Sequence, residues 1–216
     1  MADSPQPNAM PAPAPTDPAL QPYLATSPAI DHDHPAVADA ARRLAEGAAD
    51  TAALVQRCFE FVRDAVRHSA DFRLNPVTWR ASDVLQHRTG YCYAKSHLLA
   101  ALLRANGVPT GLCYQRLSVG DGGAPPYCLH GLNAVHLPGT GWLRLDARGN
   151  KPGVDAQFCP PQERLAFPIV SPEERDLPEV WAEPLPLVLA ALQRHATWDA
   201  LLADLPDLPL LPAARR

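Results

Sequence analysis

Cys92 is the residue of this chain best placed to act as a nucleophile. It stands in the first turn of a predicted helix, residues 91–106, which begins after Gly90 and ends at Asn106-Gly107. Free N–H groups and the positive end of the helix dipole favour a thiolate there, and the thiolate is the nucleophilic form. The geometry suits attack on a carbonyl carbon, with the Cys92 N–H as one oxyanion donor. The alternative is a buried structural cysteine that starts a core helix.

Two further residues could complete this chemistry. His130 lies at the start of a predicted strand, residues 129–137, and an imidazole is the usual base beside a cysteine nucleophile. Asp146 ends the next predicted strand, residues 142–146, and a carboxylate beside the base fixes its tautomer and stabilises the imidazolium. Taken singly, His130 could be a polar strand residue and Asp146 an ordinary strand-ending acid. Together with Cys92 they predict a Cys-His-Asp triad.

The hairpin between these two strands sets a geometric condition. A tight turn through Gly139-Thr140 places His130 opposite residue 149 and not opposite Asp146. A bulge, strand twist or diagonal contact must therefore bring the two side chains together.

Three segments of the chain resemble the transglutaminase-like superfamily, over about residues 60–150. The order Cys, His, Asp and the intervals between these residues suit that family. Gly90-Tyr91-Cys92 resembles the family's nucleophile segment. The family's histidine strand is matched by His130-Gly131-Leu132-Asn133-Ala134-Val135-His136-Leu137-Pro138. Its Gly-Trp-x-x-x-Asp strand is matched by Gly141-Trp142-Leu143-Arg144-Leu145-Asp146.

The resemblance implies an α+β, papain-like fold, in which the helix carrying the cysteine packs on an antiparallel sheet carrying the histidine and the aspartate. It implies acyl transfer at an amide, with Cys92 as nucleophile, His130 as base and Asp146 orienting His130. Small bacterial members are commonly described as cysteine proteases, which favours hydrolysis of a peptide, protein or small amide substrate through a thioester. A protein-glutamine transglutaminase and a catalytically silent peptide-binding module stay open as alternatives. The presence of all three residues argues against the silent module.

Three positions depart from the family pattern. Tyr91 stands where animal transglutaminases have Gln, and Leu132 and Ala134 replace the common Trp and Glu of the histidine strand. These positions touch the substrate groove, so they argue against protein crosslinking more than against thiol chemistry.

The rest of the chain predicts one domain behind a tail. Residues 1–22 are rich in Pro and Ala without an apolar period, which predicts disorder. We expect a single domain over 23–216, with a core at about 36–150 and a Leu/Pro-rich helical extension at about 177–216. Apolar spacing predicts helices at 36–46, 50–67, near 184–194 and near 196–203, and a strand at 112–117.

Composition excludes several classes of protein. Of the 216 residues 47% are hydrophobic, which is enough to form a core. The net charge is −4, so the chain lacks the excess of basic residues that is typical of proteins that bind nucleic acid. No apolar run has the length of about 18 residues that would predict a membrane helix. The five cysteines are odd in number and lack a Cys-x-x-Cys pair, which favours free thiols and a cytoplasmic protein.

The sequence predicts no cofactor and no metal. Asp31-His32-Asp33-His34 precedes a proline and an alanine-rich stretch, the pattern of a helix start. Cys128-x-His130 lacks further ligands at regular spacing. The oligomeric state is left open.

Overall fold

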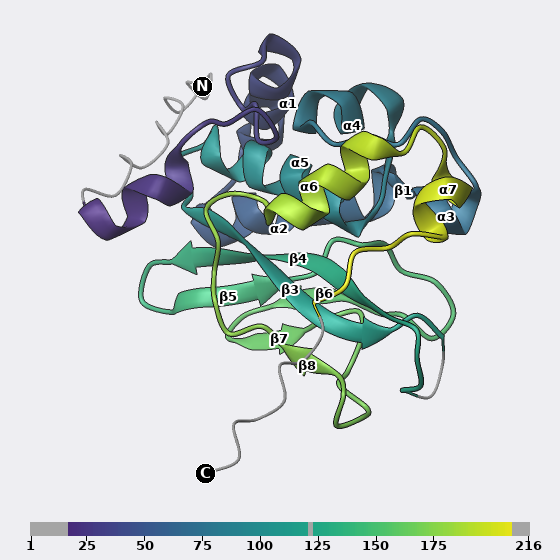
Figure 1. Ribbon diagram of the computed structural model, residues 1–216. Helices are drawn as coiled ribbons and strands as arrows, with labels where there is room; N and C mark the ends of the chain where they lie inside the picture. The colour runs from purple at the N-terminus through teal and green to yellow at the C-terminus, as the bar shows by residue number, and fades with distance from the viewer. Residues whose placement is uncertain (1–16, 121–122, 209–216) are drawn as a thin grey trace, which may run out of the picture.

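The protein has two layers, with helices packed over one face of an antiparallel sheet (Figure 1). The computed structural model describes residues 17–120 and 123–208. The four strands of the sheet lie in the order β5-β4-β3-β8. The helices are η1 (Pro18–Leu24), α1 (Pro35–Ala45), α2 (Thr51–Ala65), α3 (Ser69–Phe72), α4 (Ala81–His87), α5 (Cys92–Arg104), α6 (Pro186–Arg194) and α7 (Trp198–Leu202). The strands are β1 (Arg67–His68), β2 (Thr89–Gly90), β3 (Thr110–Ser118), β4 (Tyr127–Leu137), β5 (Gly141–Leu145), β6 (Gln157–Cys159), β7 (Gln162–Arg164) and β8 (Arg175–Asp176). This arrangement confirms the α+β class predicted from the sequence.

Helix α5 is the centre of the core. All of its residues are buried, because it packs on β3 and β4 on one side and on α1, α2 and α4 on the others. A helix that is buried all round must be apolar on every face. Its last two turns meet this condition with Leu98, Leu99, Ala100, Ala101, Leu102 and Leu103. The surrounding elements therefore hold the first turn of α5, which carries Cys92, in one position.

Two of the helices that surround α5, α1 and α2, begin at side-chain caps. The Asp50 carboxylate accepts a hydrogen bond from the Ala53 N–H at 2.8 Å at the start of α2. His34 caps α1 by accepting from the Ala36 N–H, and Pro35 is the first helical residue. The helix start predicted at residues 31–35 is confirmed.

Strands β3, β4 and β5 form a meander whose register fixes the site. Strand β3 pairs with β4 along its whole length, from Thr110 opposite Val135 to Ser118 opposite Tyr127. In the β4–β5 hairpin, Leu137 pairs with Gly141, so the turn holds three residues and not two. Gly141 has a φ of +80°, which a glycine adopts without strain. The predicted hairpin is confirmed, but its expected register was wrong by one residue.

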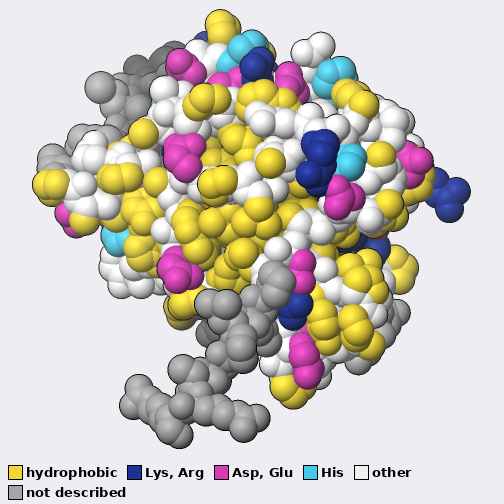
Figure 2. Space-filling model, in the orientation of Figure 1, with side chains coloured by type: hydrophobic (Ala, Val, Ile, Leu, Met, Phe, Trp, Pro, Cys, Tyr) yellow, Lys and Arg dark blue, Asp and Glu magenta, His cyan; other side chains and the backbone are white. Residues whose placement is uncertain are grey.

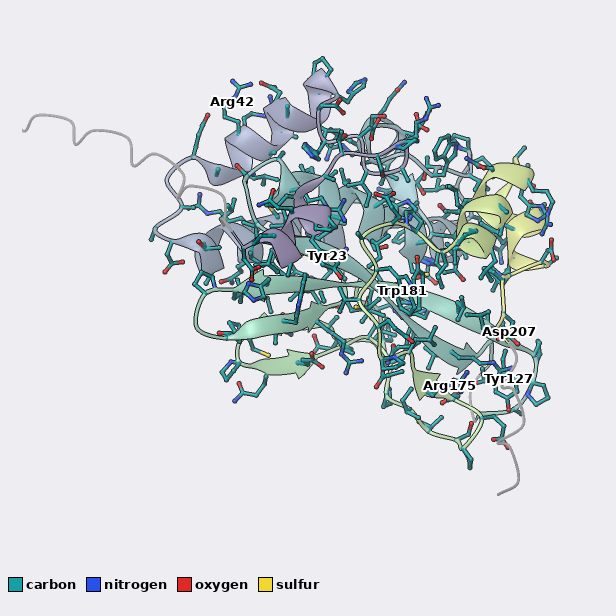
Figure 3. All side chains as sticks on the ribbon, turned by 60° about the vertical axis from the view of Figure 1, so that its left-hand side comes forward. Tyr23, Arg42, Tyr127, Arg175, Trp181 and Asp207 are labelled. Atoms are coloured by element: carbon teal, nitrogen blue, oxygen red, sulfur yellow. The ribbon has the colours of Figure 1, made fainter. Side chains whose placement is uncertain are left out.

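The expected boundary at residue 23 was wrong for the residues just before it. Pro18–Leu24 forms the 3-10 helix η1, in which Leu20 is buried, and the Tyr23 hydroxyl donates to the Val180 carbonyl oxygen at 2.9 Å. Figure 3 shows Tyr23 and the segment of Trp181 near the middle of the molecule. A short 3-10 helix tied to a distant segment leaves no apolar period, so the sequence pattern did not reveal it. Residues 1–16 lie outside the described residues.

The C-terminal extension wraps around both layers. The backbone of Trp181 exchanges two hydrogen bonds with that of Leu112 on β3, and α6 and α7 then pack on the helical layer. Hydrophobic side chains gather across the middle of the face where α6 and the segment before it lie (Figure 2). Further on, Asp207 forms an ion pair with Arg116, and its side chain lies near Tyr127 in Figure 3. The two predicted helices are confirmed, and residues 209–216 lie outside the described residues.

Arg104 joins three segments at the far end of α5. Its guanidinium donates to the carbonyl oxygens of Thr110, Ala25 and Ala182 at 3.0, 2.7 and 2.6 Å. Arg104 is almost completely buried. Burial lowers its pKa to about 10, so the side chain remains a cation at neutral pH. This one cation therefore ties the helix to the strand that follows it, to the N-terminal segment and to the C-terminal extension.

Candidate active site

The structure brings together the three residues that the sequence singled out. Cys92 is the first residue of α5, His130 lies near the start of β4, and Asp146 immediately follows β5. All three are buried, with exposed fractions of 7%, 5% and 1%. They lie where the first turn of α5 meets the part of β4 that β5 does not cover.

His130 and Asp146 form a close, buried pair. The His130 Nε2 lies 2.7 Å from the Asp146 Oδ2. Burial alone would lower the pKa of His130, but the charges of Asp146 and Cys92, with hydrogen bonds to both, raise it to about 10. The imidazole is therefore a cation at neutral pH, and the hydrogen bond is charge-assisted.

Asp146 is held as a carboxylate by groups around it. Burial would raise its pKa, but the charge and hydrogen bond of His130 lower it. The backbone N–H groups of Arg148 and Ala166 also donate to its two oxygens, each at 3.1 Å. A carboxylate that accepts several hydrogen bonds favours its charged form. Asp146 is thus fixed in position and charge opposite the imidazole.

The contact between these two residues is diagonal. Continuing the register of the β4–β5 hairpin past its last pair would place Asp146 opposite Leu132. His130 lies two residues before Leu132 on β4. Since side chains alternate along a strand, His130 and Leu132 point to the same face of the sheet. Diagonal neighbours on one face lie within reach of each other. The three-residue turn shifts the register by one residue and, with the diagonal contact, brings Asp146 to His130, although a two-residue turn would place His130 opposite residue 149.

Cys92 meets two features that favour a thiolate. Its Sγ accepts a hydrogen bond from the Gly131 N–H at 3.4 Å, beside His130. Tyr91, the N-cap of α5, makes no side-chain capping bond, so it leaves the first N–H groups of the helix open at the site. Both features present positive partial charge to the sulfur and to any oxyanion formed next to it.

Gly131 allows α5 and β4 to approach this closely. A Cβ atom at residue 131 would lie 2.8 Å from the Tyr93 Cδ1 and 3.1 Å from the Tyr93 Cα. Gly131 was not among the functional residues predicted from the sequence. The signal that could have found it is a glycine in the interior of a strand, which marks a close backbone approach.

Gly90 serves the same purpose before the helix. A Cβ atom there would lie 3.2 Å from both the Ala94 Cβ and the Thr78 Oγ1. Gly90 is itself buried. It therefore permits packing inside the protein and does not present backbone to a substrate.

A cleft of about 800 Å³ opens over Cys92 and His130. One part of its wall is apolar and includes Leu117, Val119, Phe167, Val170, Leu202 and Leu205. Another part is polar and includes His68, Asp71, Arg148 and Lys151. Phe167 joins the two parts, since its ring lies edge-on to His130 at 5.1 Å and under the Arg148 guanidinium at 5.4 Å. The polar wall was not predicted from the sequence, because its residues come from separate segments without a recognisable motif.

Three of the other cysteines lie in environments that favour the thiol. Burial raises the pKa of Cys58, Cys113 and Cys128 to about 12 in each case. All five cysteines are free. Among the described residues, no three side chains of His, Cys, Asp or Glu converge as a metal site. The helices of the described ranges are all too short or too polar to cross a membrane.

Residues 38–147 match the family model of the transglutaminase-like superfamily. This match covers half of the chain, and the chain belongs to the transglutaminase-like superfamily. No curated protein matches the sequence.

The solved structures to which the chain is similar are distant in sequence. The chain is similar to a candidate cysteine protease from Cytophaga hutchinsonii, with 19% identity and a TM-score of 0.51 over 61% of this chain and 43% of that chain. It is also similar to the periplasmic domain of TgpA from Pseudomonas aeruginosa, with 23% identity and a TM-score of 0.45 over 61% of this chain and 47% of that chain. The matches thus span less than half the length of either structure.

Proposed function

We propose that this protein is a thiol-dependent acyl-transfer enzyme that hydrolyses a peptide or amide bond. Cys92 is the nucleophile, His130 the general acid and base, and Asp146 the residue that orients His130. The observation that carries the proposal is the placement of His130, with its Nε2 at 2.7 Å from Asp146 and a raised pKa to which Cys92 contributes by charge and hydrogen bond. A base held between a nucleophile and an orienting acid is the arrangement that acyl transfer needs.

The reaction follows from these positions. The Cys92 thiolate attacks the amide carbon, and the oxyanion faces the open N–H groups at the start of α5. The His130 imidazolium gives its proton to the leaving nitrogen, so the C–N bond breaks and a thioester remains. His130 then takes a proton from water, which attacks the thioester. The acid leaves, and the Cys92 thiolate and the His130 imidazolium are restored.

The acceptor decides between hydrolysis and crosslinking. Water as acceptor gives a protease or amidase, whereas a lysine amine gives a transglutaminase. The description of the Cytophaga hutchinsonii protein as a candidate cysteine protease is in line with hydrolysis. The substrate of this chain is accordingly a peptide, a protein or a small amide.

One labelling experiment tests the nucleophile. The wild type and a His130→Ala variant are treated with limiting chloroacetamide, and peptide mapping locates the label. We expect label on Cys92 in the wild type, because Cys58, Cys113 and Cys128 are held as thiols. Equal labelling of several cysteines would favour a silent binding module.

A second experiment separates the acceptors. Fluorescent casein is incubated with the wild type and with Cys92→Ala, with and without an excess of a dansylated primary amine. Fragments that need Cys92 support hydrolysis. Incorporation of the amine without fragments would instead support crosslinking.

A further inference from the structure

His68 is a second histidine in the cleft of Cys92. It ends β1 and lies opposite Gly90 of β2, two residues before the nucleophile. Its ring packs edge-on against Tyr91 at 5.4 Å. His68, Tyr91 and Cys92 line the same cleft. The short parallel pair of β1 and β2 therefore brings a second imidazole into the cleft of Cys92, from a segment separate from β4.

The ring of His68 lacks the partners that a buried imidazole needs. His68 is 7% exposed, and its Nδ1 is fully buried without a hydrogen bond to any described residue. The nearest carboxylate oxygen, the Asp71 Oδ2, lies at 3.7 Å, beyond hydrogen-bond distance. Buried polar atoms in native proteins are nearly always paired, and an unpaired one costs free energy. The Nδ1 side of the ring therefore faces the Asp71 carboxylate inside the protein, and Nε2 is the ring nitrogen left for a ligand in the cleft that His68 lines.

Asp71 is committed to other groups. Its two oxygens accept hydrogen bonds from the Arg148 guanidinium at 2.6 and 3.0 Å, and one of them also accepts from the Lys151 Nζ at 2.8 Å. These bonds hold Asp71 close to His68 without bringing it into contact. The carboxylate therefore acts on the imidazole through its charge.

His68 and His130 are in opposite charge states. Burial lowers the pKa of His68 well below its usual value, and the charges of Arg148, Lys95 and His130 lower it further, against the opposing charge of Asp71. His68 is thus a neutral imidazole while His130 is a cation. A neutral imidazole has one donor and one acceptor nitrogen. Since the Asp71 carboxylate faces Nδ1, we assign the proton to Nδ1, which leaves Nε2 as the acceptor.

We propose that His68 binds the substrate by accepting a hydrogen bond from an amide N–H at its Nε2. Among the described residues no group forms a hydrogen bond with Nε2, and His68 lines the cleft. The inference rests on the proposed attack of Cys92 on an amide, and it narrows the substrate to amides that retain an N–H beside the reacting carbonyl. Secondary amides such as peptide bonds qualify, whereas tertiary amides do not.

Two probes that differ by one methyl group test the proposal. N-methylchloroacetamide keeps an N–H, and N,N-dimethylchloroacetamide has none. The rate of Cys92 alkylation by each is measured on the full chain by peptide mapping and divided by the rate of the same probe with glutathione. We expect the wild type to prefer the N-methyl probe by roughly three- to tenfold, the factor that one hydrogen bond gives.

Two variants distinguish binding from a structural role. In His68→Leu the preference should fall to about one, while the rate with the dimethyl probe stays within about twofold of the wild type. In His68→Gln the side-chain oxygen can accept, so part of the preference should return. Equal preference in the wild type and in His68→Leu would overturn the proposal. Absence of selective Cys92 labelling with either probe would instead overturn the proposed function.

A measurement on the wild type alone tests the proposal even if His68→Leu does not fold. The ¹⁵N resonances of the histidine side chains are recorded before and after alkylation. The acceptor resonance of His68 should move toward lower frequency in the N-methyl adduct and stay in place in the dimethyl adduct. No difference between the adducts, or a proton on Nε2 in the free protein, would contradict the proposal.

Discussion

Asp146 meets His130 across a diagonal of the sheet, with 2.7 Å between the carboxylate oxygen and the Nε2. Strand β5 ends one residue before Asp146, so the carboxylate leaves the β4–β5 ladder just beyond its last pair, while β4 stays paired with β3. This placement leaves the Gly131 N–H free to reach the Cys92 Sγ. The end of β5 thus permits two contacts at the site. Asp146 can pair with His130, and Gly131 of β4 can contact Cys92.

The close approach of α5 and β4 makes Gly131→Ala a test of the site's geometry. The added Cβ would lie 2.8 Å from the Tyr93 ring and 3.1 Å from its Cα, so the strand must move away from the helix. We expect a loss of about 1–3 kcal/mol in the free energy of unfolding, which is typical of overpacking, and slower Cys92 alkylation. Urea unfolding and peptide mapping measure the two effects. Gly120→Ala is the matched control, since a Cβ there meets no atom of the described residues within 4 Å. An unchanged alkylation rate in Gly131→Ala would show that this contact does not set the site.

The buried cation at the far end of α5 should stabilise the fold without affecting the chemistry. Arg104→Met leaves three carbonyl oxygens without their donor. We expect a loss of about 3 kcal/mol in the free energy of unfolding and a normal rate of Cys92 alkylation below the melting temperature. Arg42→Met, at an exposed arginine of α1, should change stability by less than about 0.5 kcal/mol. Similar losses in both variants would mean that the three hydrogen bonds of Arg104 contribute little.

Lys95 should make stability depend on pH. Burial, followed by the charge of Arg148, lowers its pKa to about 7 from an ordinary value near 10.5. Between these two values the unfolded chain binds more protons than the folded one, so this residue's contribution to stability increases as pH rises. Relative to Lys95→Met, the wild type should gain about 2 kcal/mol between pH 7 and pH 9.

Urea unfolding at both pH values measures this difference. Lys151→Met is the control, because its side chain is 43% exposed, and its stability should run parallel to that of the wild type. A constant difference between the wild type and Lys95→Met would show that Lys95 is charged at both pH values.

The sequence predicted the parts of the site that depend on local pattern. The apolar stripe of α5 and the stop after it placed Cys92 at a helix start, and the alternation of β4 and β5 placed His130 and Asp146 on neighbouring strands. The register of the hairpin was not predictable, because a turn of two residues and one of three both suit Pro138-Gly139-Thr140-Gly141. His68 was missed because two-residue strands such as β1 leave no periodicity to detect.

The pH dependence of Cys92 alkylation tests the central claim most directly. His130, whose pKa is raised to about 10, keeps its charge at neutral and mildly acidic pH and can pair with the thiolate. Alkylation of the wild type should therefore stay fast into mildly acidic solution. In His130→Ala the profile should move up toward that of an ordinary thiol, which titrates at about 8.5. Asp146→Asn should lie between the two, while Cys113 and Cys128 stay unchanged in all three proteins. A His130→Ala profile that coincides with the wild type would contradict the coupling of Cys92 and His130, and with it the proposed acyl transfer.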